Sequence, residues 1–123
     1  MADAADTDAI IVITHLPDRE AAMRLAQALV EKRLAACVNV LAACTSVYRW
    51  KQAIDTAQEV PLLIKTRNAL YSEVEAAIRQ VHPYELPEIL AVPLTHGLPG
   101  YLEWVAAETT KQPAGLGFIH RDG

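Results

Sequence analysis

Three side chains in this 123-residue sequence could bind a soft or borderline metal ion: Cys37, His82 and Glu85. A cysteine thiolate suits Cu(I) or zinc, an imidazole suits copper or zinc, and a carboxylate can add an oxygen ligand. Each residue also has a simpler interpretation. Cys37 lies beside Ala36 and Val38 and can pack as a small apolar residue. His82 can cap a helix end, and Glu85 can remain a solvated surface charge.

The spacing of these residues differs from that of compact metal motifs. The sequence contains no CxxC pair, no two histidines at i and i+4, and no cluster of cysteine and histidine. We expect Cys37 and His82 at opposite ends of one sheet, about 17–20 Å apart, which is the length of a strand. Metal ligands lie within about 2.3 Å of the ion. A site that uses both residues would therefore need a neighbouring subunit.

A second group of candidates alternates along one segment, where Tyr48 and Trp50 are interleaved with Arg49 and Lys51. Aromatic and arginine side chains are enriched at protein interfaces. The pattern predicts a subunit contact or the wall of a ligand cleft between subunits, and the alternative is packing within a hairpin. Basic residues such as Arg49 and Lys65 could bind an anion in such a cleft.

Hydrophobic periodicity predicts the elements that would position these residues. Apolar, β-branched runs indicate strands, and apolar residues at i, i+3, i+4 and i+7 indicate helices. We expect strands at 9–14, 34–51, 59–66 and 88–95, and helices at 19–33, 70–81 and, shorter, from 101. Residues 52–58 are expected to form a polar hairpin connection. Pro61 interrupts the third strand and predicts a bulge there, because proline cannot donate to a strand ladder.

This order of elements is typical of the ferredoxin-like βαββαβ sandwich, an α+β fold. It predicts a four-stranded antiparallel sheet in the order 4-1-3-2, with two helices on one face and a short C-terminal helix. We expect one domain at 9–110, a disordered tail at 1–8 and a second tail at 111–123. Cys37 and Cys44 would share one strand, too far apart for a disulfide.

Charge and composition exclude several functions. The formal net charge is −4, which argues against a general nucleic-acid binder. No uncharged run reaches the ~20 residues of a membrane span. The first eight residues carry three acids and no basic residue, so no targeting peptide is expected and the protein should be cytoplasmic with reduced cysteines. There is no nucleophile elbow, P-loop or GxGxxG, so we expect no enzyme activity.

Residues 34–48 carry no charge, although the predicted topology puts them at a sheet edge. An edge without a charged residue is a template for pairing with another chain. The sequence therefore predicts an oligomer.

Five blocks, in order, resemble the CutA family of divalent-cation tolerance proteins. They are RLAACVN at 33–39, SVYRW at 46–50, LIKT at 63–66, HPYELPEI at 82–89 and YLEW at 101–104. The resemblance covers about residues 10 to 109. Four residues, at three places in the chain, depart from the family pattern. Lys51-Gln52 stands where Glu-Gly is usual, Cys44 stands where glycine is usual, and Pro61 is unusual in the third strand.

The resemblance implies a homotrimer of ferredoxin-like subunits, assembled through the second and third strands, that acts in tolerance of divalent metals and binds copper. On this basis the metal ligands are expected to be Cys37, His82 and Glu85, and the interface or cleft residues Tyr48, Arg49, Trp50, Lys65 and Tyr84. The architecture is also similar to that of PII-type signalling trimers. The alternatives are therefore a trimer that binds a small anionic ligand between subunits, and a stable interaction scaffold.

Overall fold

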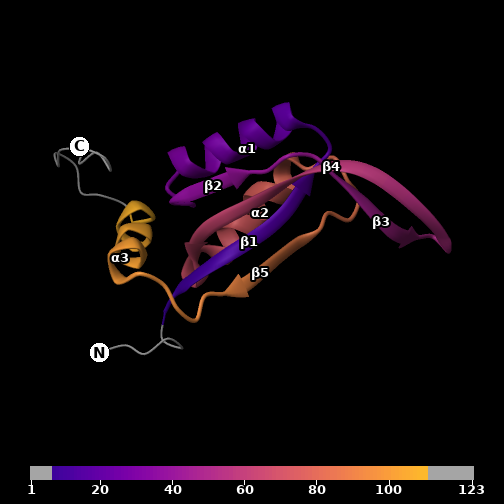
Figure 1. Cartoon of the computed structure of the whole chain (residues 1–123). Helices are drawn as coiled ribbons and strands as arrows, with labels where there is room; N and C mark the ends of the chain where they lie inside the picture. The colour runs from indigo at the N-terminus through magenta and orange to yellow at the C-terminus, as the bar shows by residue number, and fades with distance from the viewer. Residues whose placement is uncertain (1–6, 111–123) are drawn as a thin grey trace.

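The computed structural model describes residues 7–110 (Figure 1). The elements are β1 (Ala9–Leu16), α1 (Arg19–Glu31), β2 (Cys37–Val40), β3 (Cys44–Trp50), β4 (Ala53–Arg67), a 3₁₀ turn (Asn68–Leu70), α2 (Tyr71–Val81), β5 (Ile89–Pro93) and α3 (Pro99–Glu108). Of the predicted N-terminal tail, only Thr7 and Asp8 are described, and the predicted tail at 111–123 lies outside the described residues. The main chain of Asp8 contacts the domain, since its carbonyl accepts a hydrogen bond of 2.7 Å from Asn68.

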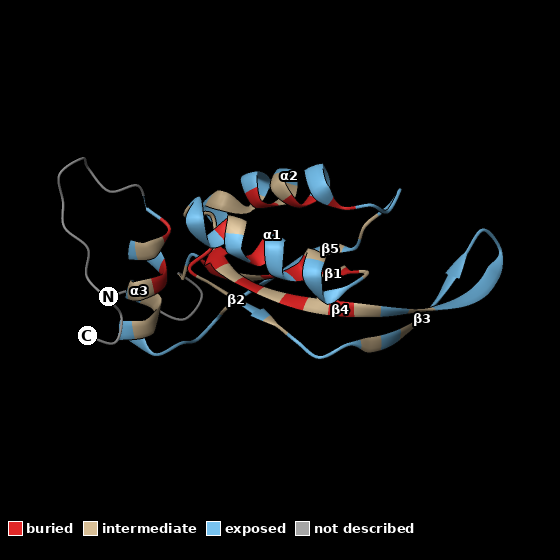
Figure 2. Ribbon diagram, turned by 90° about the horizontal axis from the view of Figure 1, so that it is seen from above, coloured by how far each residue is buried: buried red, intermediate tan, exposed pale blue. Residues whose placement is uncertain are grey.

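The predicted α+β fold class is confirmed. The sheet is antiparallel in the order β2-β4-β1-β5, and β3 also pairs with β4. Both α1 and α2 lie on the same face of the sheet (Figure 2). The sheet has five strands instead of the four expected, because the single strand predicted at 34–51 is two strands, β2 and β3. Cys37 and Cys44 therefore begin different strands, and both thiols are free.

The break between β2 and β3 lies opposite Pro61. Leu41 donates its N–H to the carbonyl of Pro61 at 3.0 Å, but proline has no N–H to return the bond. The carbonyl of Leu41 instead accepts a hydrogen bond of 3.2 Å from the guanidinium of Arg19. The pairing register changes by one residue here, from Val40↔Leu62 to Cys44↔Glu59. The bulge expected at Pro61 is therefore present, and its extra residue lies in the segment between β2 and β3 that faces Pro61.

The core lies between the two helices and one face of the sheet. Val12, Leu62 and Ile64 point toward the helices and are fully buried with Leu29 and Ile78. Helix α1 begins where the Asp18 carboxylate accepts a hydrogen bond from the N–H of Ala21 at 2.8 Å, as an N-cap should. The opposite face of the sheet, which we call the open face, carries the alternate side chains. Its apolar members are Ile11, Ile13, Leu63, Leu90 and Val92.

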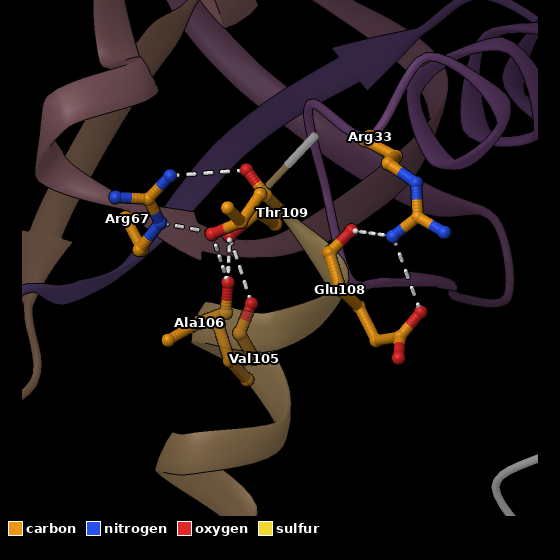
Figure 3. Close-up of polar contacts among 7 residues, drawn as sticks. Arg33, Arg67, Val105, Ala106, Glu108 and Thr109 are labelled. Atoms are coloured by element: carbon orange, nitrogen blue, oxygen red, sulfur yellow. Dashed lines mark hydrogen bonds and ion pairs between the residues drawn. The ribbon is translucent and has the colours of Figure 1, made fainter. Parts of the chain in front are cut away.

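Helix α3 is bound to one end of the sheet by two arginines (Figure 3). Arg67 donates to the hydroxyl of Thr109 at 2.9 Å and to its carbonyl at 3.0 Å. Arg33 donates to the carbonyl of Glu108 at 3.2 Å and lies 3.6 Å from its carboxylate. Both cations thus meet the C-terminal end of α3, where the helix dipole is negative. Arg33 has φ 59°, and it ends α1 with the hydrogen bonds of a Schellman motif.

At the other end of the sheet, β3 and the first half of β4 form a hairpin that extends beyond the helices (Figures 1 and 2). The turn is tight, because Lys51 and Gln52 have φ values of 49° and 70° and β4 begins at Ala53. The connection expected at residues 52–58 is therefore strand for most of its length. None of the helices in the described part of the chain has the length and apolar character needed to cross a membrane.

Candidate functional site

Both ring nitrogens of His82 are hydrogen bonded. The ring follows α2 and is buried, with Nε2 only 2.6 Å from the carbonyl oxygen of His15 in β1. The backbone N–H of Tyr84 donates to Nδ1 at 3.2 Å. Nδ1 is therefore the acceptor and Nε2 carries the proton, so this is the neutral tautomer. To bind a metal, the imidazole would have to break one of these two bonds.

Tyr84 continues the cluster toward the hairpin. Its ring lies 4.7 Å from the His82 ring, centroid to centroid. Burial raises the pKa of the Tyr84 phenol above its ordinary 10.0, and a hydrogen bond to the Glu59 carboxylate and the negative charge of Glu59 raise it further. Ser46 of β3 donates its own hydroxyl to Glu59 at 2.6 Å. Glu59 thus joins the chain after α2 to the base of the hairpin.

A second carboxylate, that of Glu88, lies beside His15 at this end of the sheet. His15 Nδ1 lies 3.4 Å from Glu88 Oε1, in a position where the nitrogen is buried and makes no hydrogen bond of good geometry. The strand predicted to end before His15 extends through it to Leu16. The structure therefore collects His15, His82 and Tyr84 with Glu59 and Glu88 at one end of the sheet.

Cys37 lies away from this cluster. It pairs with Lys65 of β4, and Lys65 in turn pairs with Ile11 of β1, whereas His82 contacts His15 four residues further along β1. At ~3.3 Å per residue this puts Cys37 about 13 Å from His82 along the strand direction. Glu85 lies on the exposed segment that follows α2. Among residues 7–110, no three His, Cys, Asp or Glu side chains are close enough to hold a metal ion. The three predicted ligands thus do not form a site within one chain.

The predicted interface residues divide between two places. Tyr48 lies on β3, and electrostatic interaction with it is a further, smaller cause of the raised pKa of Tyr84. Trp50 follows at the tip of the hairpin, with the Lys51 ammonium 5.7 Å from its ring centroid. Lys65 lies toward the other end of β4, where it donates to the side-chain oxygen of Asn39. Strand alternation puts Arg49, opposite Ile54, on the face of β4 opposite to Lys65.

Sequence reasoning missed Glu59 and Ser46. Both lie close to predicted residues, and Glu59 has the same strand parity as Pro61 and Lys65, which puts it on the open face. Counting every second residue back from Lys65 could have indicated this. The hydrogen bond to Tyr84 depends on chain segments that are distant in sequence, so no local pattern could have found it.

A sequence profile of the CutA1 divalent ion tolerance protein family matches residues 10–108. The chain belongs to this family. It is 40% identical to the divalent-cation tolerance protein CutA of Thermus thermophilus over 99 residues, which is 80% of this chain and 96% of that protein. It is 46% identical to mouse protein CutA over 89 residues, or 72% of this chain. The match spans only 50% of the mouse protein's length.

Solved structures of the family have the same fold. The structure of CutA from Xylella fastidiosa matches with a TM-score of 0.81 at 40% identity, covering 84% of this chain and 99% of that one. The protein from Thermus thermophilus matches with a TM-score of 0.81 at 39% identity, covering 83% of this chain and 99% of that one. The family resemblance expected from the five sequence blocks is confirmed.

Proposed function

We propose that this chain acts as a homotrimer in tolerance of divalent metal ions, and that it binds copper through ligands from two subunits. Membership of the divalent ion tolerance family supports the general role. The single observation that carries the assembly is the open face of the sheet, which is apolar although no element in the described part of the chain covers it. We propose no catalytic role.

The open face fits a second copy of the chain. Leu90 and Val92 are 54% and 43% exposed, and both lie on β5 at one sheet edge. At the other edge, β2 is uncharged, and alternation directs the backbone groups of Val38 and Val40 away from β4. Copies that bury the open face and pair these edges would cover the exposed apolar side chains and satisfy the unpaired backbone groups. Each Å² of apolar surface buried contributes about 25 cal/mol.

Light scattering on the purified full chain tests the assembly. We expect three times the 13.5 kDa of one chain at micromolar concentration. Leu90→Lys should lower the mass to that of one chain, because it puts a charge on the open face. Leu98→Lys is the matched control, since Leu98 is 75% exposed in the loop before α3 and off the sheet. A parent of monomer mass, or equal effects of the two substitutions, would contradict the proposal.

Copper binding rests on Cys37 and His82. Cys37 is a free, half-buried thiol, and a reduced thiol is what the expected cytoplasmic location would provide. Both ring nitrogens of His82 are already hydrogen bonded. One of the two bonds, from Tyr84 N–H to Nδ1 or from Nε2 to the His15 carbonyl, must therefore break when copper binds. Glu85 is exposed, so its carboxylate is available to a neighbouring chain.

Equilibrium dialysis with copper separates the ligands. Cys37→Ser and His82→Ala should each weaken copper binding by about tenfold or more, provided that light scattering shows an intact trimer. His96→Ala is the control, because His96 is exposed in the loop after β5. If Leu90→Lys gives a monomer with full copper binding, the ligands do not come from two subunits. If Cys37→Ser and His82→Ala both bind copper as the parent does, the proposed ligands are wrong.

A further inference from the structure

The helical layer contains a hollow of its own, between α1 and α2. Its volume is about 280 Å³, just below the ~300–1,000 Å³ of small-molecule sites. Leu16, Leu25 and Leu29 are the buried side chains at this hollow. Its lining residues come from α1, α2 and their ends and from the end of β1. The trimer proposed above uses the open face, which lies on the other side of the sheet from these helices (Figure 2). An inference about this hollow therefore does not depend on the proposed function.

Small side chains create the hollow. Ala21 and Ala28 of α1 and Ala77 of α2 line it where larger residues would fill the space between the helices. Val81, the last residue of α2, is 59% exposed beside it. The leucine, alanine and valine side chains of the lining offer no hydrogen-bond partner to a water molecule, and its polar side chains are Gln80, Arg24 and Lys32. The part of the hollow between the leucines and alanines therefore favours an apolar group.

The charged residues of the lining are both basic. Arg24 and Lys32 lie four residues before and four residues after Ala28, which puts them one helical turn to either side of it. Arg24 donates to Glu20 at 2.7 Å, but a guanidinium has five N–H donors and others remain. Lys32 forms no salt bridge with any residue of the described chain. Glu20 itself does not line the hollow.

We propose that the hollow between α1 and α2 binds a small amphipathic anion, of the class of medium-chain carboxylates with about eight carbons. The alkyl chain would enter between Ala28 and Ala77, against the leucines. The carboxylate would remain at the surface, where Arg24 and Lys32 can donate to it. A charge-assisted hydrogen bond is about twice as strong as a neutral one, and this explains why the anion is preferred to a neutral alcohol of the same length.

Calorimetric titration of the full chain with octanoate tests the proposal. Burial of each additional CH₂ should tighten binding by about fourfold, so octanoate should bind about fifteenfold more tightly than hexanoate. Octan-1-ol should bind about tenfold more weakly than octanoate. Equal affinities for octanoate and acetate would overturn the proposal, because they would show that the apolar hollow takes no part.

Variants locate the binding. Ala28→Leu should fill the hollow and abolish octanoate binding, and Ala77→Leu does the same from the other helix if the first variant does not fold. Arg24→Gln combined with Lys32→Gln should reduce the preference for octanoate over octan-1-ol to less than about twofold. Arg79→Gln is the control, because Arg79 is exposed on α2 and does not line the hollow.

Octanoate binding and trimer formation can be tested separately with the Leu90→Lys variant. Leu90→Lys should bind octanoate as the parent does, whatever its mass. Octanoate binding that is unchanged by Ala28→Leu and Ala77→Leu, or by loss of both basic residues, would overturn the assignment of this hollow. Binding that disappears in Leu90→Lys would place the ligand at the subunit interface instead, and would also overturn it.

Discussion

Both faces of this sheet carry large apolar side chains, but the two faces have different surroundings. On the helix side, Val12, Leu62 and Ile64 are fully buried by α1 and α2. On the open face, Ile13 and Leu63 occupy the alternate positions of the same strands and are only half-buried. A strand that is apolar on both faces is typical of a sheet covered on both sides. One chain covers only one side, so the comparison indicates that a partner covers the other.

Leu62 and Leu63 are adjacent in β4 and give the sharpest test of this difference. Leu62→Ala should destabilise the fold by about 3 kcal/mol, because it leaves a cavity in the core. Leu63→Ala should act mainly on assembly and lower the mass at high dilution. Urea unfolding measures the first effect and light scattering across a dilution series measures the second. If Leu63→Ala costs as much stability as Leu62→Ala and leaves the mass unchanged, the open face is not a partner surface.

The apolar periodicity of the sequence does not tell which face of the sheet the helices cover, but it predicted most of the helices and strands. Helix α1 was expected at 19–33 and spans Arg19–Glu31, because its apolar residues recur on one side and Asp18 caps it. Helix α2 was expected from residue 70 and begins at Tyr71 after a 3₁₀ turn. These boundaries depend on local side chains, which is why sequence patterns predict them.

The features that were predicted wrongly depend on contacts between distant segments. Residues 34–51 have the composition of one strand, but the missing N–H of Pro61 ends the first pairing at Val40. Its effect therefore falls on a strand twenty residues earlier in the sequence. The cluster around Glu59 and His82 was missed for the same reason. Its members come from four segments that are distant in sequence, so no local pattern brings them together.

The end of the sheet that contacts α3 differs from both faces because its contacts are polar: two arginines bind the C-terminal end of α3 there. Arg33→Ala should cost about 1–2 kcal/mol, since it removes the hydrogen bond and the ion pair to Glu108 while the backbone strain at φ 59° stays the same. Arg33→Gly should cost about 1 kcal/mol less than Arg33→Ala, because glycine adopts positive φ without strain. Thermal unfolding of both variants gives the difference. Equal losses would show that the backbone at residue 33 is not strained.

The hairpin tip is a third environment, with solvent on both sides of the ladder. Lys51 and Gln52 both have positive φ, which matches the type I′ turn that favours Asn-Gly. Replacing the pair by Asn-Gly should stabilise the chain by about 1 kcal/mol. The measurement is the urea midpoint, and Ala57→Gly in the ladder is a control that should destabilise. A loss of stability in the Asn-Gly variant would mean that the side chains of Lys51 and Gln52 hold the turn through contacts of their own.

The smallest effect is expected where the hairpin meets the body, at Tyr84. Burial and the Glu59 carboxylate raise the pKa of the Tyr84 phenol above 10.0. The folded chain holds this proton more tightly than the unfolded chain, so the contribution of Tyr84 to stability is constant at neutral pH and declines as the pH rises above 10. Glu59→Gln should lower the pKa of Tyr84 toward its ordinary value, because it removes the negative charge. Tyrosinate absorbance follows the titration, and Tyr84→Phe in each background identifies the signal of Tyr84 among the four tyrosines. If Glu59→Gln leaves this titration unchanged, Glu59 does not bind the phenol in solution. The side-chain link between the segment after α2 and the base of the hairpin would then be absent, and β3 and β4 would be joined to each other by their own ladder and by the bond from Ser46 to Glu59.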